Sequence, residues 1–292
     1  MTKDAPAQKA VGIVSKPSKP EVAQIVPQLT EWLTSRGYTF VVDPETSSFA
    51  KTAETISREA MGARKLDFVI VLGGDGTLLS AARVVAKAGI PIMGVNLGAL
   101  GFLTEVPLDE LYSTLDSIDQ GSSAIDVRSM VHCEVRRGGA IIASFDALND
   151  VVVGKGTIAR LNHCDVFIDK VFVSRYQADS LIVSTATGST AYSLAAGGPI
   201  VAPTVEAFIV TPICAHTLSN RPLVLPDTAT IDVVVKSLRE AAYLTVDGQV
   251  GIAARSEDIV RLRKAPSGVD IIQPRGKDYF EILRQKLKWG EM

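Results

Sequence analysis

Cysteine, aromatic residues and excess charge are all scarce in this sequence. Its 292 residues include three widely spaced cysteines (Cys133, Cys164 and Cys214), 6% aromatic residues and a net charge of −2. So few cysteines argue against a disulfide framework and fit reduced thiols, most of them buried as small hydrophobes. A charge near zero argues against a nucleic-acid partner, because such a surface needs a strongly basic face.

Long apolar runs are absent too. None approaches the roughly 20 residues that span a bilayer, and the N-terminal MTKDAPAQKAVG lacks the basic and then apolar layout of a secretory signal. The composition, 47% hydrophobic and 21% charged, is that of a globular protein. We therefore expect a cytoplasmic protein with no membrane partner. No histidine stands at metal-ligand spacing from the cysteines, so we predict no protein metal site.

Strand and helix patterns alternate over the first 125 residues. Fully apolar strands are expected at 11–14, 38–42, 67–72 and 90–95, with helices at 21–35, 52–65 and 77–88. Buried strands alternating with helices are typical of a parallel sheet covered on both faces. This part is predicted to be a Rossmann-like α/β nucleotide-binding domain.

Short β-type runs follow one another over residues 126–276, with turn pairs such as Gly138-Gly139 and Asp247-Gly248 between them. This rhythm predicts an antiparallel, sandwich-like all-β domain that ends with a strand at 269–272. Apolar residues at helical spacing over 278–289 predict a C-terminal helix. We expect residues 277–292 to pack back on a domain, with the first domain as the favoured partner.

The stretch VLGGDGTLLS (71–80) places one carboxylate among three glycines. Glycines after a buried strand allow close backbone approach to a ligand, and free N–H groups at a helix start attract anions. Asp75 could simply cap the helix. Alternatively, it accepts the proton of a hydroxyl while Gly73, Gly74, Gly76 and Thr77 hold a phosphoryl group nearby. GGDGT occurs in NAD kinases, lipid kinases and 6-phosphofructokinases, so alone it indicates phosphoryl transfer without naming the acceptor.

Three further segments carry polar residues or glycines beside strands. VNLGALGFLTE (95–105) forms a second close-approach loop, in which Phe102 either packs in the core or contacts a ligand. ALNDVVV (147–153) places Asn149 and Asp150 before a strand, either as an Asx turn or as a grip on a nucleotide. DSLIVSTATGSTAYSLAAGGPIVAP (179–203) carries so many small hydroxyls that we expect it to form a polar pocket wall.

With AHTLSNRP (215–222) and VDGQ (246–249), these segments closely resemble NAD kinases, in order from about residue 11 to residue 275. The resemblance implies transfer of a phosphoryl group from ATP, or from polyphosphate, to the adenosine 2′-hydroxyl of NAD. Asp75 would be the general base. It also implies Mg²⁺ or another divalent cation, the product NADP, and a homodimer or homotetramer. The residues implied to bind NAD are Asp75, Gly76, Phe102, Asn149, Asp150, Arg160, Gln177, Asp179, Thr187, Thr190, Ala191, Tyr192, Ser193, Leu194, Ala195 and Gln249.

Four positions depart from the family pattern. Ala178-Asp179-Ser180 stands where relatives commonly have Gly-Asp-Gly, Ala186 replaces a proline, and Gln177 replaces a basic residue that Arg160 does match. These changes bear on NADP affinity and on the choice between NAD and NADH, and they do not touch the proposed base. Two rival functions stay open. A lipid kinase would need a membrane-docking surface, and no basic amphipathic helix is present to provide one. A catalytically idle NADP sensor would not need Asp75.

Overall fold

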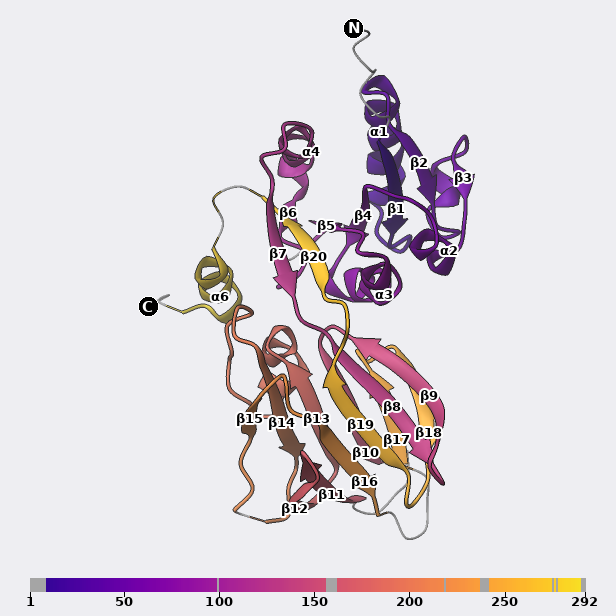
Figure 1. Cartoon of the computed structure of the whole chain (residues 1–292). Coiled ribbons are helices and arrows are strands. Elements are labelled where there is room, and N and C mark those ends of the chain that lie inside the picture. Colours follow the sequence, from indigo (N-terminus) through magenta and orange to yellow (C-terminus); the bar gives the residue numbers. More distant parts are fainter. Residues whose placement is uncertain are drawn as a thin grey trace, which may run out of the picture. The chain divides into compact units, whose positions relative to one another are not determined.

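A computed structural model of the chain describes residues 9–98, 100–155, 162–217, 219–236, 242–274, 276 and 278–289. The chain divides into two compact units, shown in Figure 1. Unit 1 comprises Met1–Val127 and Val269–Met292, and unit 2 comprises Arg128–Gly268. Within the part of the chain that is described, no helix combines the length and the apolar character needed to cross a membrane.

Unit 1 is built on an eight-stranded sheet in the order β3-β2-β1-β4-β5-β20-β7, with β6 beside β5. The pairings among β1 to β6 and β20 are parallel. The strands are β1 (Ala10–Ser15), β2 (Thr39–Val42), β3 (Glu54–Thr55), β4 (Phe68–Gly73), β5 (Ile92–Asn96), β6 (Val106–Pro107), β7 (Ala124–Arg128) and β20 (Val269–Gln273).

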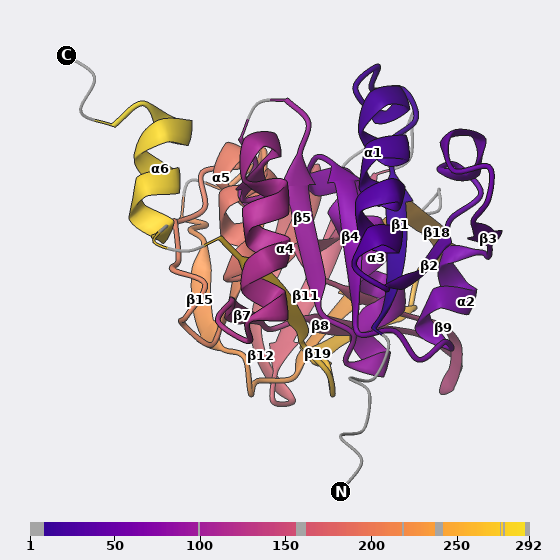
Figure 2. The same cartoon turned by 90° about the horizontal axis from the view of Figure 1, so that it is seen from above.

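Helices cover both faces of this sheet. The α-helices of unit 1 are α1 (Val22–Ser35), α2 (Arg58–Gly62), α3 (Asp75–Val85), α4 (Leu111–Asp119) and α6 (Tyr279–Leu287). The apolar sides of α1 and α4 share one buried cluster with alternate residues of β1, β4 and β5, and Figure 2 shows both helices in front of these strands. On the opposite face, Met61 of α2 approaches Gly12, and Leu78 of α3 approaches Gly94. Burial on both faces explains the continuously apolar strands.

The order of the strands reverses between β1 and β4. From β1 the chain continues to β2 and β3 on one side, whereas β4 lies on the other side of β1 and leads on to β5. In open α/β sheets, ligands bind outside the carboxyl ends of the strands at such a switch point. The Gly73–Thr77 turn leaves β4 at this place.

Unit 2 consists of two six-stranded antiparallel sheets, in the orders β15-β14-β13-β10-β17-β18 and β12-β11-β16-β19-β8-β9. Their strands are β8 (Val131–Arg137), β9 (Ala140–Ala147), β10 (Asp150–Lys155), β11 (Asn162–Ile168), β12 (Val171–Ala178), β13 (Ser180–Thr185), β14 (Ala207–Ile213), β15 (Leu223–Pro226), β16 (Ile231–Val235), β17 (Ala242–Val246), β18 (Val250–Ala254) and β19 (Ile259–Lys264). Alternate residues of both sheets share one buried core, to which β10 and β13 contribute Val151 and Val183, and β8 contributes Val131 and Val135. The predicted sandwich is confirmed.

Two sequence-based predictions fail. The helix expected at 52–65 is instead strand β3 followed by α2, a short helix capped by the Ser57 hydroxyl, which accepts a hydrogen bond from Ala60 N at 3.2 Å. Threonine and isoleucine before Ser57 favour extended backbone. The strand expected at the end of the all-β domain, β20, pairs with β5 in the parallel sheet of unit 1. The second unit therefore ends at Gly268 rather than at residue 276.

Candidate active site

The glycine-rich turn joins β4 directly to α3. Gly74 is the extended residue before the helix, and the helix begins at Asp75, two residues before the predicted start at Thr77. No side-chain hydrogen bond caps this end of α3. The interpretation of Asp75 as a simple helix cap is therefore wrong, because its carboxylate is engaged elsewhere.

The Asp75 carboxylate accepts four hydrogen bonds from the loop after β5. Its Oδ1 accepts from Leu103 N (3.1 Å), Thr104 N (3.0 Å) and Thr104 Oγ1 (3.0 Å). Among the described residues, only Phe102 N donates to its Oδ2, at 2.9 Å. Because a carboxylate oxygen has two lone pairs, Oδ2 keeps one acceptor position that the described residues do not fill. The loop thus fixes the orientation of the carboxylate and leaves one acceptor position for a hydroxyl.

Gly101 makes this arrangement possible. A Cβ at this position would lie 2.0 Å from Asp75 Oδ1 and 2.3 Å from Thr104 Oγ1, distances that no side chain could occupy. The second glycine of NLGALG is therefore required by the approach of the loop to Asp75. Phe102 lies half-buried beside it, with the Lys286 ammonium of α6 5.7 Å from the centre of its ring, a cation–π distance.

The predicted residues of unit 2 gather mainly at one edge of its first sheet. The antiparallel pairing places the start of β10 beside the ends of β13 and β17, since Asp150 pairs with Ser184 and Val151 with Val246. The Asp247 carboxylate accepts hydrogen bonds from the backbone N–H groups of Leu148, Asn149 and Asp150 at 3.3, 2.8 and 3.2 Å. The turn that carries Gln249 therefore holds the Asn149-Asp150 pair in place.

The Ser/Thr-rich segment joins the same edge. Thr185 N donates to Asn149 O at 2.9 Å, and a Cβ on Gly188 would lie 2.0 Å from that oxygen. The 3₁₀ helix Thr187–Thr190 and α5 (Tyr192–Ala195) follow directly. The structure thus brings together Asn149, Asp150, Gln249 and the predicted residues between 187 and 195.

Two predicted residues lie elsewhere in unit 2. Asp179 precedes β13, at the end of the first sheet where Ser180 pairs with Gly154, and Gln177 lies in β12 of the second sheet, two residues before Asp179. Thr185 ends β13 at the opposite edge, five residues away, which corresponds to roughly 17 Å along a strand. Arg160 lies outside the described residues.

The comparisons with known proteins agree along the whole chain. Residues 11–122 match the family model of the ATP-NAD kinase N-terminal domain, and residues 148–273 match that of the ATP-NAD kinase C-terminal domain. The NAD kinase of Koribacter versatilis is 52% identical over 283 residues, which cover 97% of this chain and 99% of the relative. That of Acidobacterium capsulatum is 47% identical with the same coverage. The chain belongs to the NAD kinase family.

Solved structures of this family share the fold. Yeast NADH kinase in complex with NADH superimposes with a TM-score of 0.90 at 26% identity, over 98% of this chain and 89% of the yeast chain. An NAD kinase from Archaeoglobus fulgidus in complex with ATP gives a TM-score of 0.75 at 24% identity, over 96% of this chain and all of its own. The predicted two-domain architecture is the NAD kinase fold.

Several hydroxyls of the Ser/Thr-rich segment are used inside the protein rather than on a pocket wall. Ser193 is fully buried and shares a 2.9 Å hydrogen bond with Thr211, and Ser189 Oγ bonds both Val201 O and Val201 N. Two departures from the family pattern cause no backbone strain. Ser180 has no positive φ, and Ala186, at φ −57°, adopts a conformation that proline would also accept.

The sequence analysis missed two residues that shape the site, Thr104 beside Asp75 and Asp247 at the second edge. It placed Gly101 in a close-approach loop, and the structure shows that the group approached is Asp75. Asp247 looks like an ordinary hairpin residue, since it and Gly248 both have the positive φ of such a turn. Its carboxylate role depends on β9 and β10, about 100 residues earlier in the chain, so nothing local in the sequence announces it.

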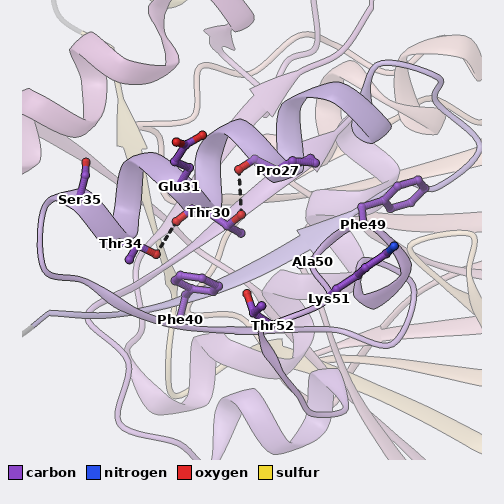
Figure 3. A pocket seen from close by; sticks show the side chains of 10 residues that line it. All are labelled: Pro27, Thr30, Glu31, Thr34, Ser35, Phe40, Phe49, Ala50, Lys51 and Thr52. Carbon is purple, nitrogen blue, oxygen red and sulfur yellow. Dashed lines mark hydrogen bonds between the residues drawn. The ribbon is translucent and has the colours of Figure 1, made fainter.

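The hollow drawn in Figure 3 is not part of this site. Its volume is about 610 Å³, and its lining comes from α1, β2 and the segment 49–52. The Thr30 and Thr34 hydroxyls beside it bond carbonyls of their own helix, as the dashed lines show. None of the predicted site residues lines it.

Substitution of Gly101 tests the loop contact. In Gly101→Ala, the new methyl group must push the loop away from Asp75, and we expect amides 102–104 to exchange at least about tenfold faster, which corresponds to about 1.4 kcal/mol of lost protection. Hydrogen exchange with mass spectrometry measures this. Gly138→Ala is the control, because its strain at φ 56° is confined to a hairpin of unit 2. Unchanged exchange in Gly101→Ala would show that these amides do not depend on Asp75.

Asp150 gives the chain a pH dependence. Burial, and secondarily the Asp247 charge, raise the pKa of Asp150 to about 7. A raised folded-state pKa means that stability present below pH 4 declines as the pH rises towards 7, by about 1.4 kcal/mol per unit. In Asp150→Asn this decline should disappear. Between pH 4 and 7 the free energy of unfolding measured in urea should therefore rise for the variant relative to the parent.

Asp165→Asn should show the opposite trend. The hydrogen bond from Arg175, the largest influence, lowers the pKa of Asp165, so the stability that this carboxylate gives unit 2 is fully present above its unfolded pKa and is lost as the pH falls through its lowered folded-state pKa. The Asp165→Asn variant should therefore lose more stability, relative to the parent, at pH 7 than at pH 2. If the stabilities of Asp150→Asn and the parent changed in parallel with pH, the raised pKa assigned to Asp150 would be wrong.

Proposed function

We propose that this chain transfers the terminal phosphoryl group of ATP to the adenosine 2′-hydroxyl of NAD, giving NADP. The observation that carries the proposal is the Asp75 carboxylate, fixed by four hydrogen bonds and left with one acceptor position at the carboxyl end of β4. The relatives named NAD kinases and the yeast enzyme solved with NADH support the identity of the acceptor.

In this proposal Asp75 Oδ2 accepts the proton of the ribose hydroxyl as the hydroxyl oxygen attacks the terminal phosphorus of ATP. A ribose hydroxyl is a poor nucleophile at neutral pH, and a positioned base contributes about 10²–10⁴-fold. Gly73, Gly74 and Gly76 would hold the transferred phosphoryl group, whereas the Thr77 N–H donates to Gly74 O at 2.9 Å within the turn. Phe102 would lie along the adenine. The residues gathered around Asn149 and Asp150 would hold the rest of the dinucleotide.

A divalent cation fits this site only as part of the nucleotide. Within the described ranges no cluster of three histidine, cysteine or acidic side chains could hold a metal ion, and the Asp75 oxygens are largely occupied by loop donors. Mg²⁺ in such enzymes is commonly held by substrate phosphates with one or two carboxylates. It would neutralise charge on the phosphates, while the open acceptor position of Asp75 Oδ2 would serve the ribose hydroxyl.

We also infer that the working enzyme is a homo-oligomer in which Asp179 and Gln177 serve the site of a second chain. These two residues lie at the far end of β13 from Asn149 and Asp150, so within one unit 2 the predicted NAD-binding residues fall into two separate groups. A homodimer or homotetramer offers a second copy of Asp179 to the first group.

The activity is tested by adding ATP, Mg²⁺ and NAD to the purified protein and detecting NADP with an NADP-specific dehydrogenase. Asp75→Asn should lower turnover by about 10²–10⁴-fold, because the carboxamide cannot take the proton, while NAD binding stays within a few-fold. Asp109→Asn, an exposed carboxylate after β6, should keep the parental rate. Turnover on diacylglycerol without NADP formation would identify a lipid kinase instead.

Mixing two inactive variants tests the shared site. Asp75→Asn and Asp179→Asn are co-refolded or co-expressed. If Asp179 acts in a second chain's site, a mixed dimer has one intact site, and random mixing restores about a quarter of parental activity. If Asp179 acts within its own chain, every site in the mixture lacks one residue. The absence of any recovered NADP formation, with mixed assembly shown by native mass spectrometry, would contradict the inference.

A further inference from the structure

Two lysines on the loop after β1 have no role in the site as described so far. Lys16 and Lys19 belong to the segment Lys16-Pro17-Ser18-Lys19-Pro20, which joins β1 to α1. Among the residues that the structure describes, neither ammonium group has an ion-pair or hydrogen-bond partner. Some other cations of unit 1 are paired, as Arg58 is with Asp43 and Lys9 with Asp119.

The loop holds these two lysines close together. Lys19 N donates to Lys16 O at 3.0 Å, which closes a tight turn with Pro17 at its second position. Proline at that position presets the backbone for a turn, and the first and fourth residues of a turn lie within about 7 Å of each other. The loop therefore presents two positive charges on a backbone that is already ordered.

Both lysines border the carboxyl end of β4. Lys16 N donates to Leu72 O at 3.0 Å, and the Lys16 Cβ lies 3.4 Å from where a Gly73 Cβ would stand. On the other side, Lys19 Nζ lies 3.0 Å from the corresponding position at Gly98, after β5. Because β4 lies between β1 and β5 in the sheet, the lysines flank the strand that leads into the Gly73–Thr77 turn.

We propose that Lys16 and Lys19 bind the phosphate chain of the phosphoryl donor beside the Gly73–Thr77 turn. The place is the switch point between β1 and β4, where open α/β sheets bind ligands, and the unpaired ammonium groups match a chain of negative oxygens. The absence of a side chain at Gly74, where no atom lies within 4 Å of the Cβ position, lets this chain approach the backbone. The inference deepens the proposed function, since it rests on a phosphate-chain donor.

The recognised chemistry is a linear polyphosphate, which occurs both in ATP and in inorganic tripolyphosphate. Calorimetry with each compound separates the phosphate contacts from those to the nucleoside, and it needs neither NAD nor turnover. If the chain proves not to make NADP, this binding experiment still has an outcome of its own.

The test compares Lys16→Gln and Lys19→Gln with Lys16→Arg and Lys65→Gln. Lys65 is an exposed lysine that precedes β4 and so lies at the amino edge of the same sheet. Each Gln variant at 16 or 19 should bind MgATP and tripolyphosphate about tenfold more weakly, with the largest loss at low ionic strength. Lys16→Arg should stay within about threefold of the parent, and Lys65→Gln should match it.

Steady-state kinetics give the second readout. The KM for ATP should rise about tenfold in Lys16→Gln and Lys19→Gln, with the KM for NAD within about twofold of the parent. Parental ATP and tripolyphosphate binding in both Gln variants would overturn the proposal. A raised KM for NAD with an unchanged KM for ATP would overturn it too, because the lysines would then serve the dinucleotide.

Discussion

Four hydrogen bonds to the Asp75 carboxylate determine its orientation, on which the proposed site of unit 1 depends. The Asp75 side chain leaves the first turn of α3 and accepts donors from Phe102, Leu103 and Thr104 on the loop after the neighbouring strand. Without a side chain at Gly101 the loop comes close enough to do this. One interaction thus joins the two glycine loops of unit 1 and leaves a single carboxylate oxygen with room for a hydroxyl.

In unit 2, a carboxylate likewise accepts several backbone N–H groups at the end of the first sheet where β10 begins. There Asp247 accepts three backbone N–H groups and holds Asn149 and Asp150 at the start of β10. In both units a carboxylate organises the backbone of a segment distant in sequence. The absence of a side chain makes room for that carboxylate at Gly101, and for the Asn149 backbone at Gly188. Burial beside Asp247 raises the pKa of Asp150, so this edge combines tight packing with a carboxyl group that titrates near neutral pH.

The sequence predicted the fold class and the motifs well because both depend on local patterns. Continuous apolar strands and glycine turns reveal a parallel sheet whatever its neighbours do, and the all-β rhythm reveals the sandwich. The helix predicted at residues 52–65 was wrong because β-branched residues in this segment favour extended backbone, although its apolar residues have helical spacing. Strand β20 misled because its partner β5 lies far earlier in the chain, with Ile271 paired to Ile92. The contacts of Asp75 and Asp247 could not be predicted, since each joins segments that only the folded chain brings together.

The most direct test of this account is a crystal structure of the protein with NAD bound. It predicts the adenosine 2′-oxygen within hydrogen-bond reach of Asp75 Oδ2, about 2.6–3.2 Å away, with the loop 102–104 still donating to the same carboxylate. A bound NAD whose ribose lies far from Asp75, or a carboxylate turned away from the loop to meet it, would contradict the account.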